Sequence, residues 1–210
     1  MNIGIIGAGN VGGTLGKRWA QNGHRLIFSS REPASEQMRK LLADAGPGAR
    51  SGSVAETAAA SDVLVIATPW PATEEVLKSA GDLSGKILID ATNPLLPGLE
   101  GLSVGTTTSA AEQVAVWAGG AKVVKAFNTV GYNIMADSTF GPGRVAMFYC
   151  GDDAAAKKTA AALIEELGFE ALDAGPLKQS RLLEPFAMLW ISLALKHGYS
   201  REIGFQFMRR

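Results

Sequence analysis

A glycine-rich turn directly after a short apolar run is the feature that most constrains how this chain can fold. Residues 2–6 read as a buried strand, and the residues from Asn10 to Asn22 have the pattern of a helix that Gly23 ends. The turn between them has the form G-x-G-x-x-G and consists of Gly7, Ala8, Gly9, Asn10, Val11 and Gly12. A strand, this motif and a helix in immediate succession are typical of the first unit of a dinucleotide-binding sheet.

The three glycines each have a physical reason in such a turn. Gly7 permits the tight turn out of the strand, Gly9 lets a pyrophosphate approach the backbone, and Gly12 lets the helix pack closely on the strand. The pyrophosphate would lie on the free amides at the positive end of the helix. The alternative is a glycine-rich turn that binds no ligand, which the position after the first strand of the chain disfavours.

Short β-branched runs alternate with Ala-rich amphipathic stretches along the next hundred residues, as in a parallel sheet covered by helices. The further strands expected there are Arg25–Ser29, Ala49–Ser53, Asp62–Ala67, Lys86–Asp90 and Lys122–Phe127. The sequence therefore predicts an α/β fold of the Rossmann type, with a doubly wound, mainly parallel sheet of about six strands.

The pattern changes after Thr129. The elements expected beyond it are strands at Val145–Cys150 and Phe169–Leu172, a helix at Asp152–Leu167, a long apolar helix at Leu177–His197 and an edge strand at Ile203–Met208. We therefore expect residues 1–129 to form the dinucleotide-binding domain and residues 130–210 to form a small C-terminal α+β cap that packs on it.

The end of the second strand indicates which dinucleotide fits. An NAD site places an acidic residue about 20 residues after the glycines, where it accepts from the ribose 2′-hydroxyl. Here the strand runs into Ser29, Ser30 and Arg31. A guanidinium can pair bidentately with a 2′-phosphate, and a serine hydroxyl can donate to it. The sequence therefore predicts NADP(H), while the neighbouring Glu32 leaves NAD as the alternative.

Further candidate ligands follow the later strands, at the edge of the sheet where α/β proteins bind ligands. They are Thr68, Pro69, Trp70, Asn93, Ala126 and Asn128. The proline and tryptophan could line a ring of the cofactor, and the asparagine amides could bond to the nicotinamide or to a second ring. The alternatives are that Trp70 is a packing residue and that the asparagines serve only their own turns.

Several kinds of chemistry are excluded. One cysteine and two histidines rule out a disulfide within the chain and a cysteine- or histidine-rich metal centre. A net charge of zero, from 20 basic and 20 acidic residues, disfavours a nucleic-acid surface. His24 and His197 are poorly placed to act as a general acid, so the catalytic residue is left open. A carbonyl reductase needs such an acid, whereas a flavin-like ring asks less of the protein, which favours a ring as hydride acceptor.

The chain resembles the deazaflavin-dependent NADP oxidoreductase family. The segments that carry the resemblance are GAGNVG, SSRE, DATNPL, KAFNT and most of residues 151–194. The family transfers hydride between NADPH and 8-hydroxy-5-deazaflavin, and a related domain of membrane metalloreductases uses a flavin such as FMN or FAD instead. Ser29 stands where the family has a glycine, and the loop Ala91–Thr108 has no match to a deazaflavin site.

The resemblance implies NADP-binding roles for Gly7, Gly9, Asn10, Val11, Ser30 and Arg31, with Asn93 and Asn128 at the border of the site. It predicts an NADPH-dependent oxidoreductase with a flavin- or deazaflavin-like small-molecule acceptor. The alternatives are a pyrroline-carboxylate or other imine-type reductase and an NADP-sensing protein without turnover.

The last long helix is apolar on more than one side, so we expect a homodimer that buries part of it. No targeting segment and no apolar run of about 20 residues is visible, so we expect a cytoplasmic protein without a membrane partner.

Overall fold

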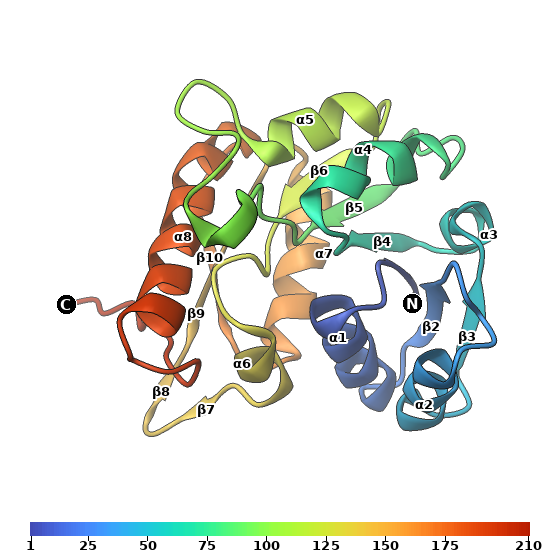
Figure 1. Ribbon diagram of the computed structural model, residues 1–210, viewed down its shortest axis with the longest axis horizontal. Helices are drawn as coiled ribbons and strands as arrows, with labels where there is room; N and C mark the ends of the chain where they lie inside the picture. The colour runs from blue at the N-terminus through green and yellow to red at the C-terminus, as the bar shows by residue number, and fades with distance from the viewer.

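The computed structural model describes all residues from 1 to 210 and builds the fold around one eight-stranded sheet (Figure 1). The strand order is β10-β9-β6-β5-β4-β1-β2-β3. The six strands of the first part are β1 (Asn2–Ile6), β2 (Arg25–Ser29), β3 (Ala49–Gly52), β4 (Val63–Ile66), β5 (Ile87–Asp90) and β6 (Lys122–Lys125). All six are parallel to one another, which confirms the expected Rossmann-type sheet.

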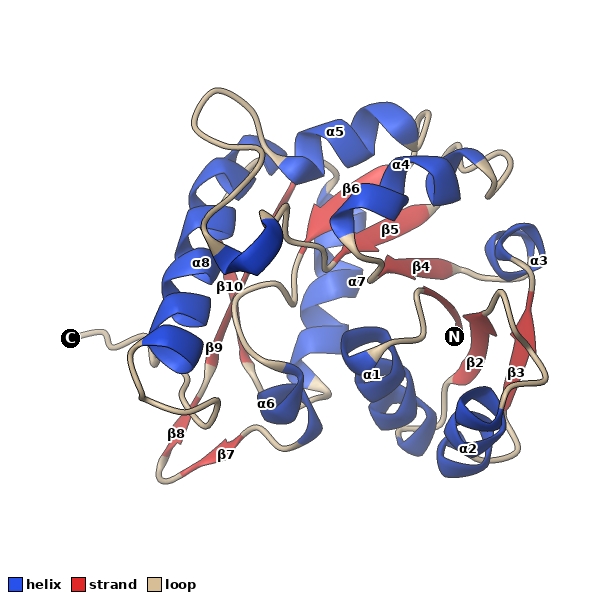
Figure 2. Cartoon of the chain, in the orientation of Figure 1, coloured by secondary structure: helices blue, strands red, loops and turns tan.

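Helices cover both faces of the sheet (Figure 2). The principal ones are α1 (Asn10–Gln21), α2 (Glu36–Ala45), α3 (Val54–Ala59), α4 (Trp70–Lys78), α5 (Ala110–Trp117), α6 (Tyr132–Ala136), α7 (Ala154–Glu165) and α8 (Ser180–Lys196). Short 3₁₀ turns lie at Pro97–Leu99 and Leu177–Gln179. None of the helices combines the length and the apolarity that crossing a bilayer requires.

Alternation along the central strands divides the core into two layers. Ile3 and Ile5 of β1 belong to the cluster formed with α1, α2 and α7, whereas Ile6 belongs to the cluster formed with α3, α4 and α5. Successive side chains of a strand point to opposite faces, so a strand that is buried on both faces must be apolar throughout. This explains why the central runs of the sequence read as continuously hydrophobic.

The C-terminal segment extends the same sheet. β9 (Ala146–Gly151) pairs antiparallel with the end of β6, and β10 (Glu170–Asp173) pairs parallel with β9. A small separate hairpin joins β7 (Thr139–Phe140) to β8 (Gly143–Arg144). The cap expected from the sequence is thus continuous with the first part of the sheet.

The prediction of a strand at Ile203–Met208 is wrong, because the tail forms no regular pairing. β6 pairs only with the last two residues of β9, so the other end of β9 has a free edge. The tail covers that edge with a single backbone bond, in which the Ala146 amide donates to the Phe205 carbonyl at 2.8 Å. The indole of Trp190 anchors the same tail by donating to the Ile203 carbonyl, also at 2.8 Å.

Candidate functional site

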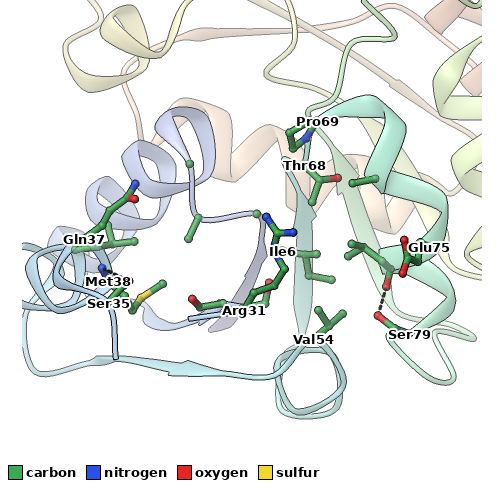
Figure 3. Close-up of a pocket in the computed structure, with 18 residues that line it drawn as sticks. Ile6, Arg31, Ser35, Gln37, Met38, Val54, Thr68, Pro69, Glu75 and Ser79 are labelled. Atoms are coloured by element: carbon green, nitrogen blue, oxygen red, sulfur yellow. Dashed lines mark hydrogen bonds between the residues drawn. The ribbon is translucent and has the colours of Figure 1, made fainter. Parts of the chain in front are cut away.

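A cleft of about 570 Å³ opens at the carboxyl edge of β1, β2 and β4 (Figure 3). It lies between α2 and α4, and Arg31 stands between the two groups of lining side chains. Of the residues predicted from the sequence, those that line it are Gly7, Ala8, Gly9, Ser29, Ser30, Arg31, Thr68 and Pro69. The first three strand ends of the predicted site therefore meet in one cavity.

The three glycines of the motif have different surroundings. A methyl group built on Gly9 would meet nothing within 4 Å, so this position is open toward the cleft. Gly7 has a positive φ of +100°, and its methyl group would lie 2.7 Å from the carbonyl carbon of Ala67. One built on Gly12 would overlap the Gly7 carbonyl oxygen. The fold itself requires the outer two glycines, whereas the middle one leaves space for a ligand.

The N-terminus of α1 is free to bind an anion. Gly9 is its N-cap, and no side chain bonds to the amides of the first turn. Those amides carry the positive end of the helix dipole, and no acidic side chain lies in that turn. The site therefore fits the pyrophosphate of a dinucleotide.

The end of β2 presents donors and a cation to the cleft. The Ser30 hydroxyl accepts from the Glu32 amide at 3.0 Å, which leaves its own hydrogen free to donate. Arg31 is exposed and forms no ion pair within the chain. Ser29 is buried beneath them. A free guanidinium beside a free hydroxyl suits a phosphate group.

The side walls of the cleft come from three helices and were not predicted from the sequence. The lining residues it did not name include Ser35, Gln37, Met38 and Leu41 near α2, Val54 at the start of α3, and Ala72, Glu75, Val76 and Ser79 on or next to α4. Their positions follow helical periodicity, but which face of each helix turns to the cleft depends on tertiary packing. The apolar side chains among them face the cleft from both sides, with Met38 and Leu41 on one and Ala72 and Val76 on the other, and suit a flat ring such as adenine.

Trp70, Asn10 and Val11, which the sequence also predicted as cofactor ligands, lie outside the cleft. Trp70 packs on Trp117 of α5 with ring centroids 5.2 Å apart, as in the packing alternative for this residue. Asn10 lines a smaller neighbouring cavity of about 330 Å³, and Val11 packs against the core. Thr68 stays at the cleft, where its hydroxyl lies 2.9 Å from that of Thr73.

The two asparagine turns lie against each other. The Asn93 amide donates to the Asn128 carbonyl at 3.0 Å, and the Asn128 amide donates to Asn93 Oδ1 at 3.2 Å and to the Leu183 carbonyl at 3.2 Å. Ala126 is buried between β6 and this turn. The two turns continue the carboxyl edge beyond the cleft, over β5 and β6.

Phe127 explains why β6 is two residues shorter than expected. Its φ is +62°, in the left-handed region that a bulky side chain rarely adopts. The backbone therefore leaves the strand before this residue, and the ring packs edge-on against Trp19 at 5.5 Å. Such strain is kept only where the surroundings enforce it, and it clusters at functional sites.

A buried group of charges lies beneath these turns and was also missed from the sequence. The Lys125 ammonium lies 2.9 Å from Asp90 Oδ2 and 3.2 Å from Glu184 Oε1, and all three side chains are almost completely inaccessible. Burial alone would lower the pKa of Lys125, but the two carboxylates outweigh it and raise that pKa above its ordinary value. The ammonium therefore stays charged.

Comparison with known proteins gives a consistent result. The model of the family described as NADP oxidoreductase, coenzyme F420-dependent, matches residues 2–94. The F420-dependent NADP reductase of Methanothermobacter marburgensis is 31% identical over an alignment of 211 positions that covers 94% of each chain. Metalloreductase STEAP3 of Rattus norvegicus is 30% identical over 184 residues, which are 87% of this chain and 35% of that protein.

The same similarity extends to the solved structures. The crystal structure of a candidate F420-dependent NADP reductase from Arthrobacter sp. FB24 superposes on this chain with a TM-score of 0.88. The two are 30% identical, and the superposition covers 99% of each chain. The whole architecture, including the C-terminal extension of the sheet, is therefore shared with that protein.

Proposed function

Because this chain belongs to the family of coenzyme F420-dependent NADP oxidoreductases, we propose that it transfers hydride between NADP(H) and the deazaflavin ring of coenzyme F420. The coarser part of this function, an NADP-dependent oxidoreductase, follows from the family itself. The observation that supports the cofactor is the cleft, in which an open glycine, free helix amides and an unpaired arginine meet.

The proposed binding mode assigns a role to each side of the cleft. The amides around Gly9 bind the pyrophosphate, and Ser30 with Arg31 binds the 2′-phosphate. The apolar side chains of α2 and α4 hold the adenine. The nicotinamide half then extends along the sheet edge past Pro69 toward the turns of Asn93 and Asn128.

For this reaction the protein has to orient the two rings and does not have to transfer a proton. The reduced nicotinamide, when bound, supplies the hydride, and the acceptor ring delocalises the resulting charge. The two turns at the proposed ring site carry the side-chain amides of Asn93 and Asn128, and neither turn contains a histidine. They position two rings against each other and keep water away.

The direct test is oxidation of NADPH, followed at 340 nm, with separate acceptors. Coenzyme F420 should be reduced at least about tenfold faster than FMN or FAD, and pyrroline-5-carboxylate should not be reduced. Faster turnover with the imine would contradict the proposal and favour an imine-type reductase. Tight NADPH binding without turnover on any acceptor would instead indicate a sensing protein.

A second test addresses the choice of cofactor. Arg31→Ala should weaken NADPH binding about tenfold, the value of one charge-assisted contact, and leave NADH binding within about twofold. Arg39→Ala is the matched control, because Arg39 is also an exposed arginine, lies on α2 and lines neither cavity. Equal losses for both cofactors would contradict the assignment.

The proposal includes a homodimer that uses α8. Leu183, Ala187 and Trp190 of this helix are buried within the chain. Leu182 and Leu189 lie on its outer side and are 66% and 50% exposed. An apolar stripe left open on a helix whose other side is already packed suits a second copy of the same helix across a two-fold axis.

A further inference from the structure

We propose that Lys125, held by Asp90 and Glu184, is a positioning residue that fixes the two asparagine turns against α8 and so holds the nicotinamide half of the site in register for hydride transfer. The inference rests on the proposed function, because it concerns the part of the cofactor that reacts. It assigns no contact between Lys125 and the cofactor. Lys125 acts only through the backbone and side chains that it anchors.

The contacts of Lys125 use its full bonding capacity. An ammonium group has three donors, and here it has three acceptors: Asp90 Oδ2 at 2.9 Å, the Thr92 carbonyl at 2.6 Å and Glu184 Oε1 at 3.2 Å. None of the three charged side chains reaches solvent, so each depends on partners within the protein. Removal of one partner would leave an uncompensated charge in the core, which forces the surroundings to move.

Glu184 connects this centre to a second helix. Its Oε2 accepts from the Ala110 amide at 2.8 Å, and its Oε1 accepts from the Ala111 amide at 3.0 Å. It therefore caps the N-terminus of α5, whose positive end helps to balance one cation against two carboxylates. One side chain of α8 thus fixes β6 and α5 together.

The same centre reaches both asparagine turns. Asp90 Oδ1 accepts from the amide and the hydroxyl of Thr92, at 2.9 and 2.7 Å, which sets the backbone that leads into Asn93. Lys125 is the last residue of β6, and the chain runs from it through the strained Phe127 to Asn128. Asn128 then bonds to the Leu183 carbonyl, next to Glu184. Two neighbouring residues of α8 therefore hold both turns.

The position along the sheet edge determines which half of the cofactor is affected. The cleft with Arg31 lies over β1, β2 and β4, whereas Asp90 and Lys125 end β5 and β6, farther along the same edge. A dinucleotide spans such an edge from its adenine half to its nicotinamide half. Loss of Lys125 should therefore disturb the reacting ring and leave the adenine half unchanged.

The test compares two parts of the cofactor in Lys125→Met and in the shape-conserving Glu184→Gln. The dissociation constant of adenosine 2′,5′-bisphosphate, which lacks the nicotinamide, should stay within about twofold of the wild type in both variants. The fluorescence enhancement of the bound nicotinamide of NADPH should fall by about half or more in Lys125→Met. Single-turnover hydride transfer to coenzyme F420 should fall about tenfold or more, because a small misplacement of reacting atoms is costly. Glu184→Gln should show the same pattern with smaller changes.

Arg181→Gln is the matched control. Arg181 also joins α8 to α5, through bonds of 2.8 and 2.6 Å to Glu112, but it contacts neither asparagine turn. It should lower the melting temperature without changing the nicotinamide fluorescence or the hydride transfer rate. Equal changes in Arg181→Gln and Lys125→Met would overturn the proposal, because the effect would then be general loosening of α8.

Two further results would also overturn it: weaker bisphosphate binding in Lys125→Met, or unchanged nicotinamide fluorescence and transfer rate. If Lys125→Met does not fold, Glu184→Gln decides by the same criteria. A wild-type protein that reduces no deazaflavin would overturn the proposed function alone. The fluorescence of bound NADPH would then still decide whether Lys125 positions the ring.

Discussion

The glycines of the motif differ in what an added side chain would meet, so their substitutions should have opposite consequences. Gly9→Val should fold with a melting temperature close to that of the wild type, because the position is open. It should lose NADPH affinity about 100-fold or more, because the side chain would fill the space of the pyrophosphate. Gly12→Ala should instead lose about 1–3 kcal/mol of unfolding free energy, because the methyl group meets backbone.

Calorimetric titration with NADPH and urea denaturation measure the two effects separately. If Gly9→Val bound NADPH with unchanged affinity, the phosphates would have to lie elsewhere. If Gly12→Ala were as stable as the wild type, the close approach of α1 to β1 would not matter for the fold. Each variant is the control for the other, and both are compared with the wild type.

Cys150 should be chemically silent in the folded protein. Burial raises the pKa of its thiol to about 12, although the nearby Lys125 opposes the shift. At pH 8 the reactive thiolate is then only about 10⁻⁴ of the population, compared with about a quarter for a free cysteine. An aromatic disulfide reagent should label the native protein at least about 100 times more slowly than the same chain in denaturant. Labelling of the native protein at the rate of a free thiol would contradict this.

At the level of elements, the pair of Arg181 on α8 and Glu112 on α5 should make the free energy of unfolding at acid pH depend on Glu112. The hydrogen bond from the Arg181 guanidinium is the main cause that lowers the pKa of Glu112 below its usual 4.5. A carboxyl whose pKa is lowered on folding stabilises the protein fully at pH values above its unfolded pKa. This contribution is lost as the pH falls through the pKa of the folded state. Glu112→Gln should therefore reduce the drop in unfolding free energy between about pH 5 and pH 3.

Urea denaturation at several pH values measures this dependence. Arg181→Gln should reduce the same drop, since the two residues form one pair, and the double variant should add little to either single change. A pH profile of Glu112→Gln that is parallel to that of the wild type would show that this pair does not contribute to acid stability.

Most elements could be predicted because their ends are marked locally. α1 was expected to begin at Asn10 and does so, because the glycine motif sets its start. The tail could not be predicted, since its apolar residues satisfy a strand pattern, but it forms only one backbone bond to β9. The direction of β9 likewise depends on how the chain returns from α6, which no local pattern records.

The candidate site divides in the same way. The residues that line the cleft from strand ends were predicted, because the carboxyl edge of a parallel sheet collects them. The helix residues of its walls and the bond from Lys125 to Glu184 were not, because they join segments that are distant in sequence. Nothing in the local sequence around Lys125 or Glu184 indicates that the two side chains pair.

For the molecule as a whole, the open side of α8 should determine the state of assembly. We expect the wild type to be a dimer in light scattering at micromolar concentration. Leu189→Glu should give folded monomers, because it places a charge on the exposed stripe. Val116→Glu is the control, since Val116 is an exposed apolar residue of α5 and should leave the dimer intact.

A wild type that stays monomeric at high concentration would contradict the dimer. A dimer that both glutamate variants preserve would contradict only the use of α8. Met188→Glu would test the interface less directly than Leu189→Glu, because the Met188 side chain packs within the chain against the cluster of Trp190.

The late position of Glu184 has a consequence for chains emerging from the ribosome. All residues that line the cleft precede residue 80, so they leave the ribosome well before α8 is made. Lys125 can meet Asp90 once β5 and β6 pair, but Glu184 can pair with Lys125 only when α8 has been made. A product that stops before α8 would therefore have one carboxylate for its buried cation and an uncapped α5. Such a fragment would keep every residue that lines the cleft but would lack the Leu183 carbonyl of α8 to which Asn128 bonds.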